Sequence, residues 1–193
     1  YIDKLHGKID ALAERFAKGE INRQQFQELF GYYQVEIANL ENYLAQNPDS
    51  ARWKEMVSEG QSILIRKRNA TRLLGYSILH NQSGLPIRTF GDFGLDPALF
   101  VPMLYAYQNA TQEIFGAPMQ ATQIEGGRWL SFIPGEITTA IVLFTTEPAP
   151  QQLTRLRQAQ RVFEQANRKT LEKQPVDGDG LIVPMDYFLQ RGL

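Results

Sequence analysis

The sequence predicts an α+β protein: a five-stranded antiparallel sheet with helices on both faces, in the order α-ββ-α-βββ-α, preceded by an antiparallel helical hairpin. Three observations lead to this prediction. Apolar residues recur at steps of three and four near both ends of the chain, which is the spacing of a helix face. Five short apolar runs, bounded by turn residues, fill the middle. The 193 residues, 43% of them hydrophobic, suffice for one full-sized domain and an appendage.

The helical hairpin is predicted over residues 1–48. Gly19 suits a left-handed cap after the first helix, and Asn22 can cap the second by accepting a backbone N–H. Asn47-Pro48 ends the second helix. The two apolar stripes, which should pair antiparallel, are Ile2, Leu5, Ile9, Leu12 and Phe16 and then Phe26, Leu29 or Phe30, Tyr33, Ile37, Leu40 and Leu44.

Residues 12–26 of this hairpin resemble a short helical module found at the ends of many bacterial proteins. The shared pattern is a helix, then Gly, a polar residue and Ile, a capping residue, and an aromatic residue four positions on; here Gly19, Ile21, Asn22 and Phe26 match it. The resemblance implies oligomerisation or docking. A plain amphipathic hairpin explains the same residues.

The α+β domain is predicted over residues 49–174. Asp49 or Ser50 starts its first helix, and two strands follow over residues 73–79 and 85–90, joined by a polar turn. Pro86 has no N–H, so it is expected at the start of its strand or on an edge.

A middle helix is predicted from Asp96-Pro97 to Gly116. It carries one apolar stripe through Leu99 and Met103 and a second apolar set on another side. A helix that is apolar on two sides is enclosed by the fold or covered by a partner. The second set is Phe100, Leu104 and Tyr105.

Three more strands are predicted over residues 121–125, 128–134 and 138–146, with Gly126-Gly127 as a strong hairpin signal. A long amphipathic helix then runs from Leu153 to Thr170. The remaining tail, residues 175–193, is too apolar to be left in water. We expect it to dock on its own domain or to add a strand to a neighbour.

The order of these elements resembles the roadblock/longin superfamily, whose small domains are related in shape to profilin. The best local match is Gly75-Tyr76-Ser77-Ile78-Leu79-His80-Asn81-Gln82-Ser83-Gly84-Leu85-Pro86-Ile87, which is similar to the opening hairpin of that family. The resemblance implies a noncatalytic, dimerising scaffold or regulator of a small Ras-like GTPase. In that family the middle helix and a neighbouring sheet edge commonly form the dimer. The resemblance therefore nominates Phe100, Leu104, Tyr105, Gln123 and Glu125 as interface residues.

Composition limits the kinds of catalytic, cofactor and metal site that the chain can form. The chain has no cysteine and only two histidines, His6 and His80, and it lacks the phosphate-binding, dinucleotide-binding and nucleophile-elbow motifs. Asp177-Gly178-Asp179-Gly180 resembles the start of a calcium loop, but Phe188 stands where the loop needs Glu, so a turn is the better interpretation. His80 is interpreted as a solvated strand end. We expect no enzyme activity, no cofactor and no metal site.

Charge is distributed unevenly although the net charge is only −1. Residues 49–72 hold six basic and three acidic groups, and residues 151–174 hold six basic and two acidic groups. Residues 73–150 between them hold two basic and six acidic groups, so this middle segment is acidic. A balanced total argues against a nucleic-acid binder. The first and last helices of the domain could together form a basic surface, although two ordinary solvated helix faces are the simpler explanation of the same residues. Its residues would be Arg66, Lys67, Arg68, Arg155, Arg157, Arg161, Arg168 and Lys169.

No apolar run approaches the roughly 18 residues of a membrane-spanning helix, so we expect a soluble, cytoplasmic protein. A homodimer that binds a small GTPase is the leading hypothesis. The alternative is a sensory or ligand-binding signalling domain of similar α+β shape, which would hold a small molecule between sheet and helix.

Overall fold

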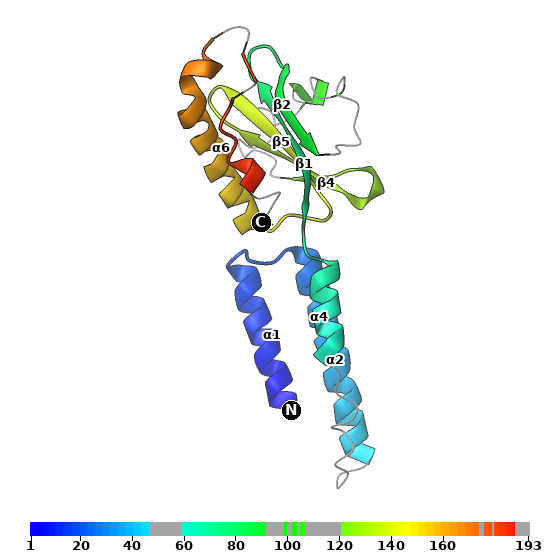
Figure 1. Ribbon diagram of the computed structural model, residues 1–193. Coiled ribbons are helices and arrows are strands. Elements are labelled where there is room, and N and C mark those ends of the chain that lie inside the picture. The colour runs from blue at the N-terminus through cyan, green and yellow to red at the C-terminus, as the bar shows by residue number, and fades with distance from the viewer. Residues whose placement is uncertain are drawn as a thin grey trace. The chain divides into compact units, whose positions relative to one another are not determined.

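The computed structural model describes residues 1–46, 59–91, 99, 102–103, 105–106, 121–173, 176–178 and 180–187 (Figure 1). The chain divides into two compact units. The first comprises residues 1–70 with 149–151, and the second comprises residues 71–148 with 152–193. Each unit is described by itself.

The first unit is helical. It contains α1 (Ile2–Ala17), α2 (Arg23–Gln46) and α4 (Glu59–Arg68). Helices α1 and α2 are joined by a short turn and pack along their apolar stripes. The buried side chains of this core are Leu5, Leu12, Ile21, Leu29, Tyr33 and Ile37. The predicted hairpin is present, because both stripes follow the helical period and face one another.

The turn between α1 and α2 has the capping chemistry that the sequence predicts. Gly19 has φ +71°, a conformation that glycine adopts without strain. The Asn22 side chain accepts the Gln25 N–H at 2.7 Å, and the Gln25 side chain accepts the Asn22 N–H at 3.1 Å. This reciprocal capping box satisfies two donors that would otherwise be orphaned at the start of α2.

Helix α4 packs on α2, although the sequence analysis assigned this segment to the α+β domain. Glu28 on α2 accepts hydrogen bonds from Arg68 Nη2 at 2.5 Å and from Asn69 Nδ2 at 2.8 Å. Ile65 also packs against the core of the first unit. The division between the units therefore falls after Ala70 rather than near residue 48. The start of the helix predicted from Asp49 or Ser50 lies outside the described residues.

The second unit is built on the predicted five-stranded antiparallel sheet, in the order β2-β1-β5-β4-β3. The two central strands, β1 and β5, are buried along most of their length. Gly126 and Gly127 have φ of +79° and +75° in the turn before β4, as a tight Gly-Gly connection requires. The strands are β1 (Leu73–His80), β2 (Pro86–Gly91), β3 (Thr122–Gln123), β4 (Trp129–Pro134) and β5 (Thr138–Phe144).

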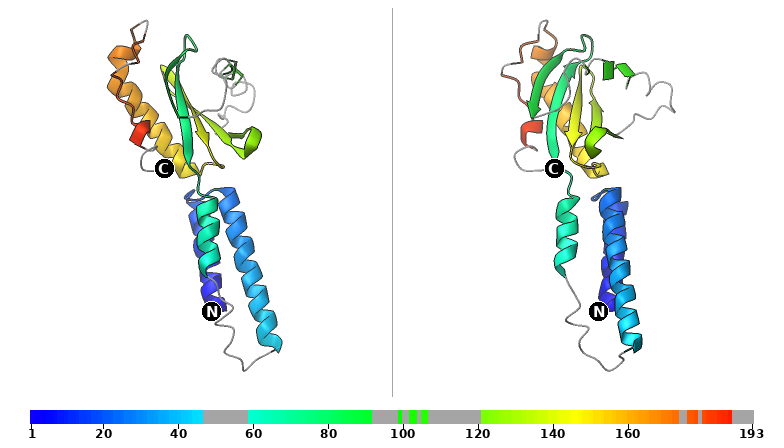
Figure 2. Two further views of the ribbon diagram at one scale, coloured as in Figure 1. Left: turned by 45° about the vertical axis from the view of Figure 1, so that its right-hand side comes forward. Right: turned by 90° about the vertical axis from the view of Figure 1, so that its right-hand side faces the viewer.

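Alternation along the strands separates two apolar clusters, one on each face of the sheet. On one face, α6 (Pro150–Leu171) inserts Leu156 and Phe163 against Tyr76, Val142 and Phe144. Figure 2 shows α6 lying along that side of the sheet. The opposite face carries a second cluster, Leu79, Leu130, Phe132, Ile141 and Leu143, against which Met103 of the middle helical segment packs. The predicted fold class is confirmed.

A buried carboxylate ties α6 to the turn between β4 and β5. Glu164 accepts the backbone N–H groups of Glu136, Ile137 and Thr138 at 2.7 to 2.9 Å, and it also accepts the Thr138 hydroxyl at 2.8 Å. One turn earlier on the helix, Gln160 Nε2 donates to the same hydroxyl at 2.7 Å. Three backbone donors that the turn leaves unpaired are thus satisfied by one side chain.

The tail packs on the same face as α6. Met185 is fully buried in the first cluster, and Val176, Leu181 and Val183 pack against it. Asn167 on α6 binds the tail backbone at Ile182 through two hydrogen bonds. Its Nδ2 donates to the Ile182 carbonyl at 2.7 Å, and its Oδ1 accepts the Ile182 N–H at 2.9 Å. The described tail residues, 176–178 and 180–187, therefore lie against their own domain.

No helix in the described ranges is long and apolar enough to cross a membrane.

Replacing Glu28 with Gln should destabilise the packing of α4. The hydrogen bond from Asn69, aided by Arg68, lowers the pKa of Glu28 below its ordinary value. The ionised form is therefore favoured in the folded state, so its contribution is present above about pH 4.5 and is lost as the pH falls through the lowered pKa. We expect Glu28→Gln to lower the free energy of unfolding by about 1 kcal/mol at pH 7 and to equal the wild type near pH 2.

Urea denaturation followed by circular dichroism measures this difference. Glu14→Gln is the control, because the side chain of Glu14 contacts Lys18 at 3.4 Å in an exposed position. A Glu28 variant whose deficit does not change with pH would contradict the assignment.

Replacing Glu164 with Gln should destabilise the second unit much more strongly. The amide oxygen cannot accept all four donors, and the amide N–H₂ group would face N–H groups of the turn. We expect a loss of about 3 kcal/mol in the free energy of unfolding, measured by tryptophan fluorescence in urea. Glu172→Gln on the same helix is the matched control, because its contact with Arg168 is exposed and 4.0 Å long. Equal effects of the two substitutions would show that the buried carboxylate does not organise this turn.

Candidate interaction surfaces

The β3 strand is one edge of the described sheet, and it carries Gln123, one of the expected interface residues. The Ile124 N–H donates to the Arg128 carbonyl at 2.8 Å, and Gln123 pairs with Trp129 in the next register position. Hydrogen-bonded and non-hydrogen-bonded pairs alternate along an antiparallel ladder. The backbone N–H and C=O of Gln123 therefore point away from β4, toward the edge of the described sheet.

Two other expected interface residues lie beside this edge or on the helical segment. Glu125 is exposed in η2 (Glu125–Gly127), which follows β3 directly. Tyr105 is helical and 55% exposed, whereas Met103, two positions before it, packs against the sheet. Side chains two positions apart on a helix point about 200° away from each other around its axis. Met103 therefore faces the sheet, and Tyr105 faces outward. Phe100 and Leu104 lie outside the described residues.

The basic residues predicted to form one surface belong to different units. Arg66, Lys67 and Arg68 lie on α4 of the first unit. Two of them make contacts inside that unit: Arg68 with Glu28, and Arg66 with the Tyr33 hydroxyl at 3.3 Å. These two arginines help to hold α4 on α2.

The five basic residues on α6 differ in their surroundings. Arg168 pairs with Glu136 at 2.6 Å, and Arg161 donates to the Gln158 side chain at 2.9 Å. Arg157 is half-buried, and Lys169 is exposed. Arg155 is exposed and has no hydrogen bond or ion pair among the interactions of the described residues. Arg157 and Lys169 likewise have none, so two of the three predicted basic residues on this helix without a described partner lie in its first half.

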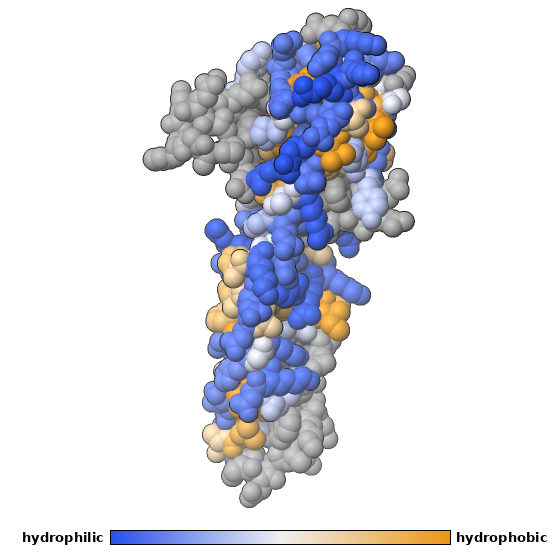
Figure 3. All heavy atoms as spheres, turned by 90° about the vertical axis from the view of Figure 1, so that its left-hand side faces the viewer, coloured by the Kyte–Doolittle hydropathy of each residue, from blue (hydrophilic) through white to orange (hydrophobic). Residues whose placement is uncertain are grey.

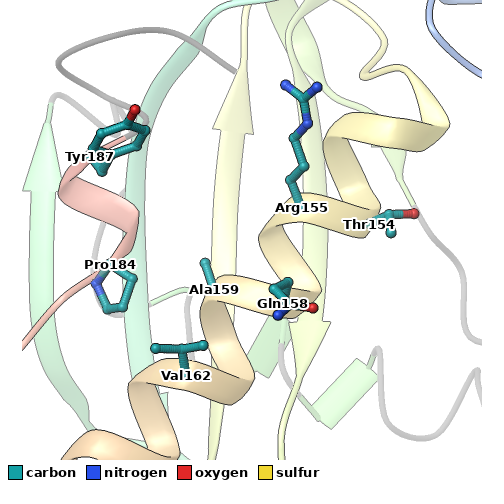
Figure 4. Close-up of a pocket in the computed structure, with 7 residues that line it drawn as sticks. All are labelled: Thr154, Arg155, Gln158, Ala159, Val162, Pro184 and Tyr187. Carbon is teal, nitrogen blue, oxygen red and sulfur yellow. The ribbon is translucent and has the colours of Figure 1, made fainter.

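An apolar groove lies between α6 and the tail, and sequence reasoning missed it. Its volume is about 450 Å³. The helix and the short helical turn of the tail form opposite walls (Figure 4). The lining residues are Thr154, Arg155, Gln158, Ala159, Val162, Pro184 and Tyr187. The apolar composition of the tail was the available signal, but the sequence did not reveal which part of α6 the tail would contact.

A polar latch fixes the tail beside this groove. The Tyr76 hydroxyl on β1 donates to Asp186 of the tail, and Arg88 on β2 lies 3.9 Å from the other carboxylate oxygen. Burial, together with the hydrogen bond to Asp186, raises the pKa of Tyr76 well above 10. Tyr76 therefore stays neutral and acts as a donor at physiological pH.

The structure describes His80 and part of the acidic turn at residues 177–180. His80 is buried, not solvated as expected, and its Nδ1 lies 3.3 Å from the Ser83 hydroxyl. The turn after β1 folds back over the strand end, since the His80 N–H donates to the Leu85 carbonyl. Asp179 lies outside the described residues. Among the residues that are described, no group of three or more His, Cys, Asp or Glu side chains is placed to hold a metal ion.

No protein-family model matches the chain, and no curated protein matches it. Function is therefore inferred from the element order, the β3 edge of the described sheet, and the surfaces of α6 and the tail.

Replacing Tyr76 with Phe should loosen the tail while leaving the aromatic ring in the core. The substitution removes the only hydroxyl that donates to Asp186 among the described contacts. A hydrogen bond to a charged group contributes roughly 1.5 to 3 kcal/mol, so we expect at least tenfold faster amide exchange over residues 181–187. Hydrogen–deuterium exchange with mass spectrometry measures this rate. Tyr105→Phe is the control, because Tyr105 is exposed; unchanged exchange in Tyr76→Phe would contradict the latch.

Proposed function

We propose that the chain is a noncatalytic, homodimeric scaffold or regulator of a small Ras-like GTPase and acts in the cytoplasm through protein–protein contacts. The observations that carry the proposal are the β3 edge of the described sheet and the exposed Tyr105 on the helical segment, in a sheet with two strands before that segment and three after it. The GTPase partner comes from the resemblance to the roadblock/longin superfamily. The cytoplasmic location follows from that partner.

In the proposed dimer, the β3 strands of two copies pair across a two-fold axis. An exposed edge strand is a ready template for another strand, because its outward N–H and C=O groups lack ladder partners. Gln123 supplies these groups here. Since β3 has only two residues, most of the affinity must come from apolar anchors. Tyr105, which is exposed on the helical segment, is the proposed anchor among the described residues.

A proline at position 123 tests the dimer directly. Proline is tolerated on an edge strand where the N–H faces away from the ladder. Gln123→Pro should therefore fold but lose the hydrogen bond to the second copy, whereas Gln123→Ala keeps the N–H and should remain dimeric. We expect light scattering at micromolar concentration to give twice the chain mass of 22.0 kDa for the wild type and Gln123→Ala, and the chain mass for Gln123→Pro.

A monomeric wild type, or a dimeric Gln123→Pro, would contradict the proposed interface. The GTPase part needs a separate measurement: binding of the wild-type chain to purified small Ras-like GTPases loaded with GDP or with a GTP analogue. Absence of binding to all of them would reject the GTPase while leaving the dimer intact.

The alternative function, a ligand-binding signalling domain, is favoured by one observation. The groove between α6 and the tail has the size and the apolar lining of a small-molecule site. It lies between a helix and the tail rather than between sheet and helix as the sequence analysis expected.

A further inference from the structure

The groove between α6 and the tail has a mainly apolar lining. Ala159 and Val162 on the helix face Pro184 of the tail across it (Figure 4). Val162 is 41% exposed although it stands next to the buried face of α6. Apolar surface also gathers beside the polar outer face of α6 in Figure 3. The described part of the tail thus leaves part of the apolar flank of α6 uncovered.

The same groove has one charged end. Arg155 lines it and makes no hydrogen bond or ion pair within the described part of the chain. Figure 4 shows its guanidinium group and the Tyr187 hydroxyl pointing toward one end, away from Val162 and Pro184. None of the described residues that line the groove is acidic. The surrounding residues 151–174 hold six basic and two acidic groups, so the electrostatic potential there favours an anion.

An apolar trough with a cation at one end is complementary to an amphiphile with a negative head. Small-molecule sites combine a mainly apolar lining with a few placed polar groups, and about 450 Å³ lies within their usual range of roughly 300 to 1,000 Å³. A guanidinium group matches a carboxylate because its N–H donors can bind both oxygens. A wholly polar ligand would leave Ala159, Val162 and Pro184 without a partner, and a cationic amphiphile would be repelled by Arg155.

We infer that this groove binds a free long-chain carboxylate, with the carboxylate at Arg155 and the acyl chain over Ala159, Val162 and Pro184. The site is separate from the β3 edge and does not depend on the proposed dimer. The tail has a defined role in this arrangement, because Pro184 and Tyr187 form one wall. The Tyr76–Asp186 latch and the Asn167–Ile182 hydrogen bonds hold that wall in place.

Sodium decanoate below its micellar concentration is the probe, added to the full chain and followed by isothermal titration calorimetry. We expect saturable binding, and affinity that rises about two- to fourfold with each added methylene in the series from hexanoate until the chain fills the groove. Decyltrimethylammonium has the same chain length but the opposite charge. It should bind at least tenfold more weakly.

Two pairs of variants separate the charged end from the apolar trough. Arg155→Gln should weaken decanoate binding about tenfold, whereas Lys169→Gln, which removes an equal charge from the same helix outside the groove, should change it less than twofold. Val162→Asp should abolish saturable binding. Ile182→Asp is its control, because Ile182 is 62% exposed and does not line the groove. All four positions are exposed, and the folded state of each variant is checked by circular dichroism and by amide exchange over residues 181–187.

Three results would overturn the inference: no saturable decanoate binding by the wild type, equal binding by Val162→Asp, or equal affinity for decyltrimethylammonium. A fourth result would reassign the surface. If decanoate fails to bind and Val162→Asp converts a dimer to a monomer in light scattering, the groove is a contact between copies. The Gln123→Pro variant distinguishes that outcome from failure of the β3 interface, because it leaves the groove unchanged.

Discussion

The second unit depends on one buried carboxylate. Glu164 accepts three backbone N–H groups and a hydroxyl from the turn between β4 and β5, so it fixes α6 on the sheet at the point where two strands reverse direction. The turn is matched to it: a Cβ atom at Gly135 would collide with the carboxylate. Asn81 holds the same turn from the other side, since its Nδ2 donates to the carbonyls of Gly135 and Glu136. Apolar packing brings the helix and sheet together, but these directional bonds determine their register.

Polar side chains on the same helix as Glu164 also position the tail and the groove beside it. Gln160, Glu164 and Asn167 form one buried polar stripe on α6. The first two bind the β4–β5 turn, and the third binds the tail backbone. The stripe therefore positions the sheet on one side of the helix and the tail on another, and the groove is the space that this arrangement leaves. The β3 edge is set independently, by the turn at Gly126 and Gly127. Contact between copies and binding of an amphiphile would thus use separate parts of one scaffold.

Local patterns in the sequence predicted most of the architecture. The two stripes of the hairpin, Gly19, Asn22 and the Gly126-Gly127 turn act over a few residues, and their periods or backbone requirements are visible in the chain itself. Helix α4 was assigned to the sheet domain because its decisive contacts, Arg68 and Asn69 with Glu28, join residues about 40 positions apart. The sequence does not single out Glu164, since nothing local distinguishes a buried carboxylate from a solvated one. The groove escaped prediction for the same reason: its two walls, around Val162 and Pro184, meet only in the folded chain.

Amide proton exchange of the native protein, followed by NMR, tests the central claim most directly. Turn amides normally exchange quickly because water reaches them. If Glu164 binds the turn, the N–H groups of Glu136, Ile137 and Thr138 should exchange as slowly as those in the middle of β5, and their proton signals should be shifted downfield by the carboxylate. Exchange of these three amides at the rate of an unprotected loop, while the β5 amides remain protected, would contradict the account.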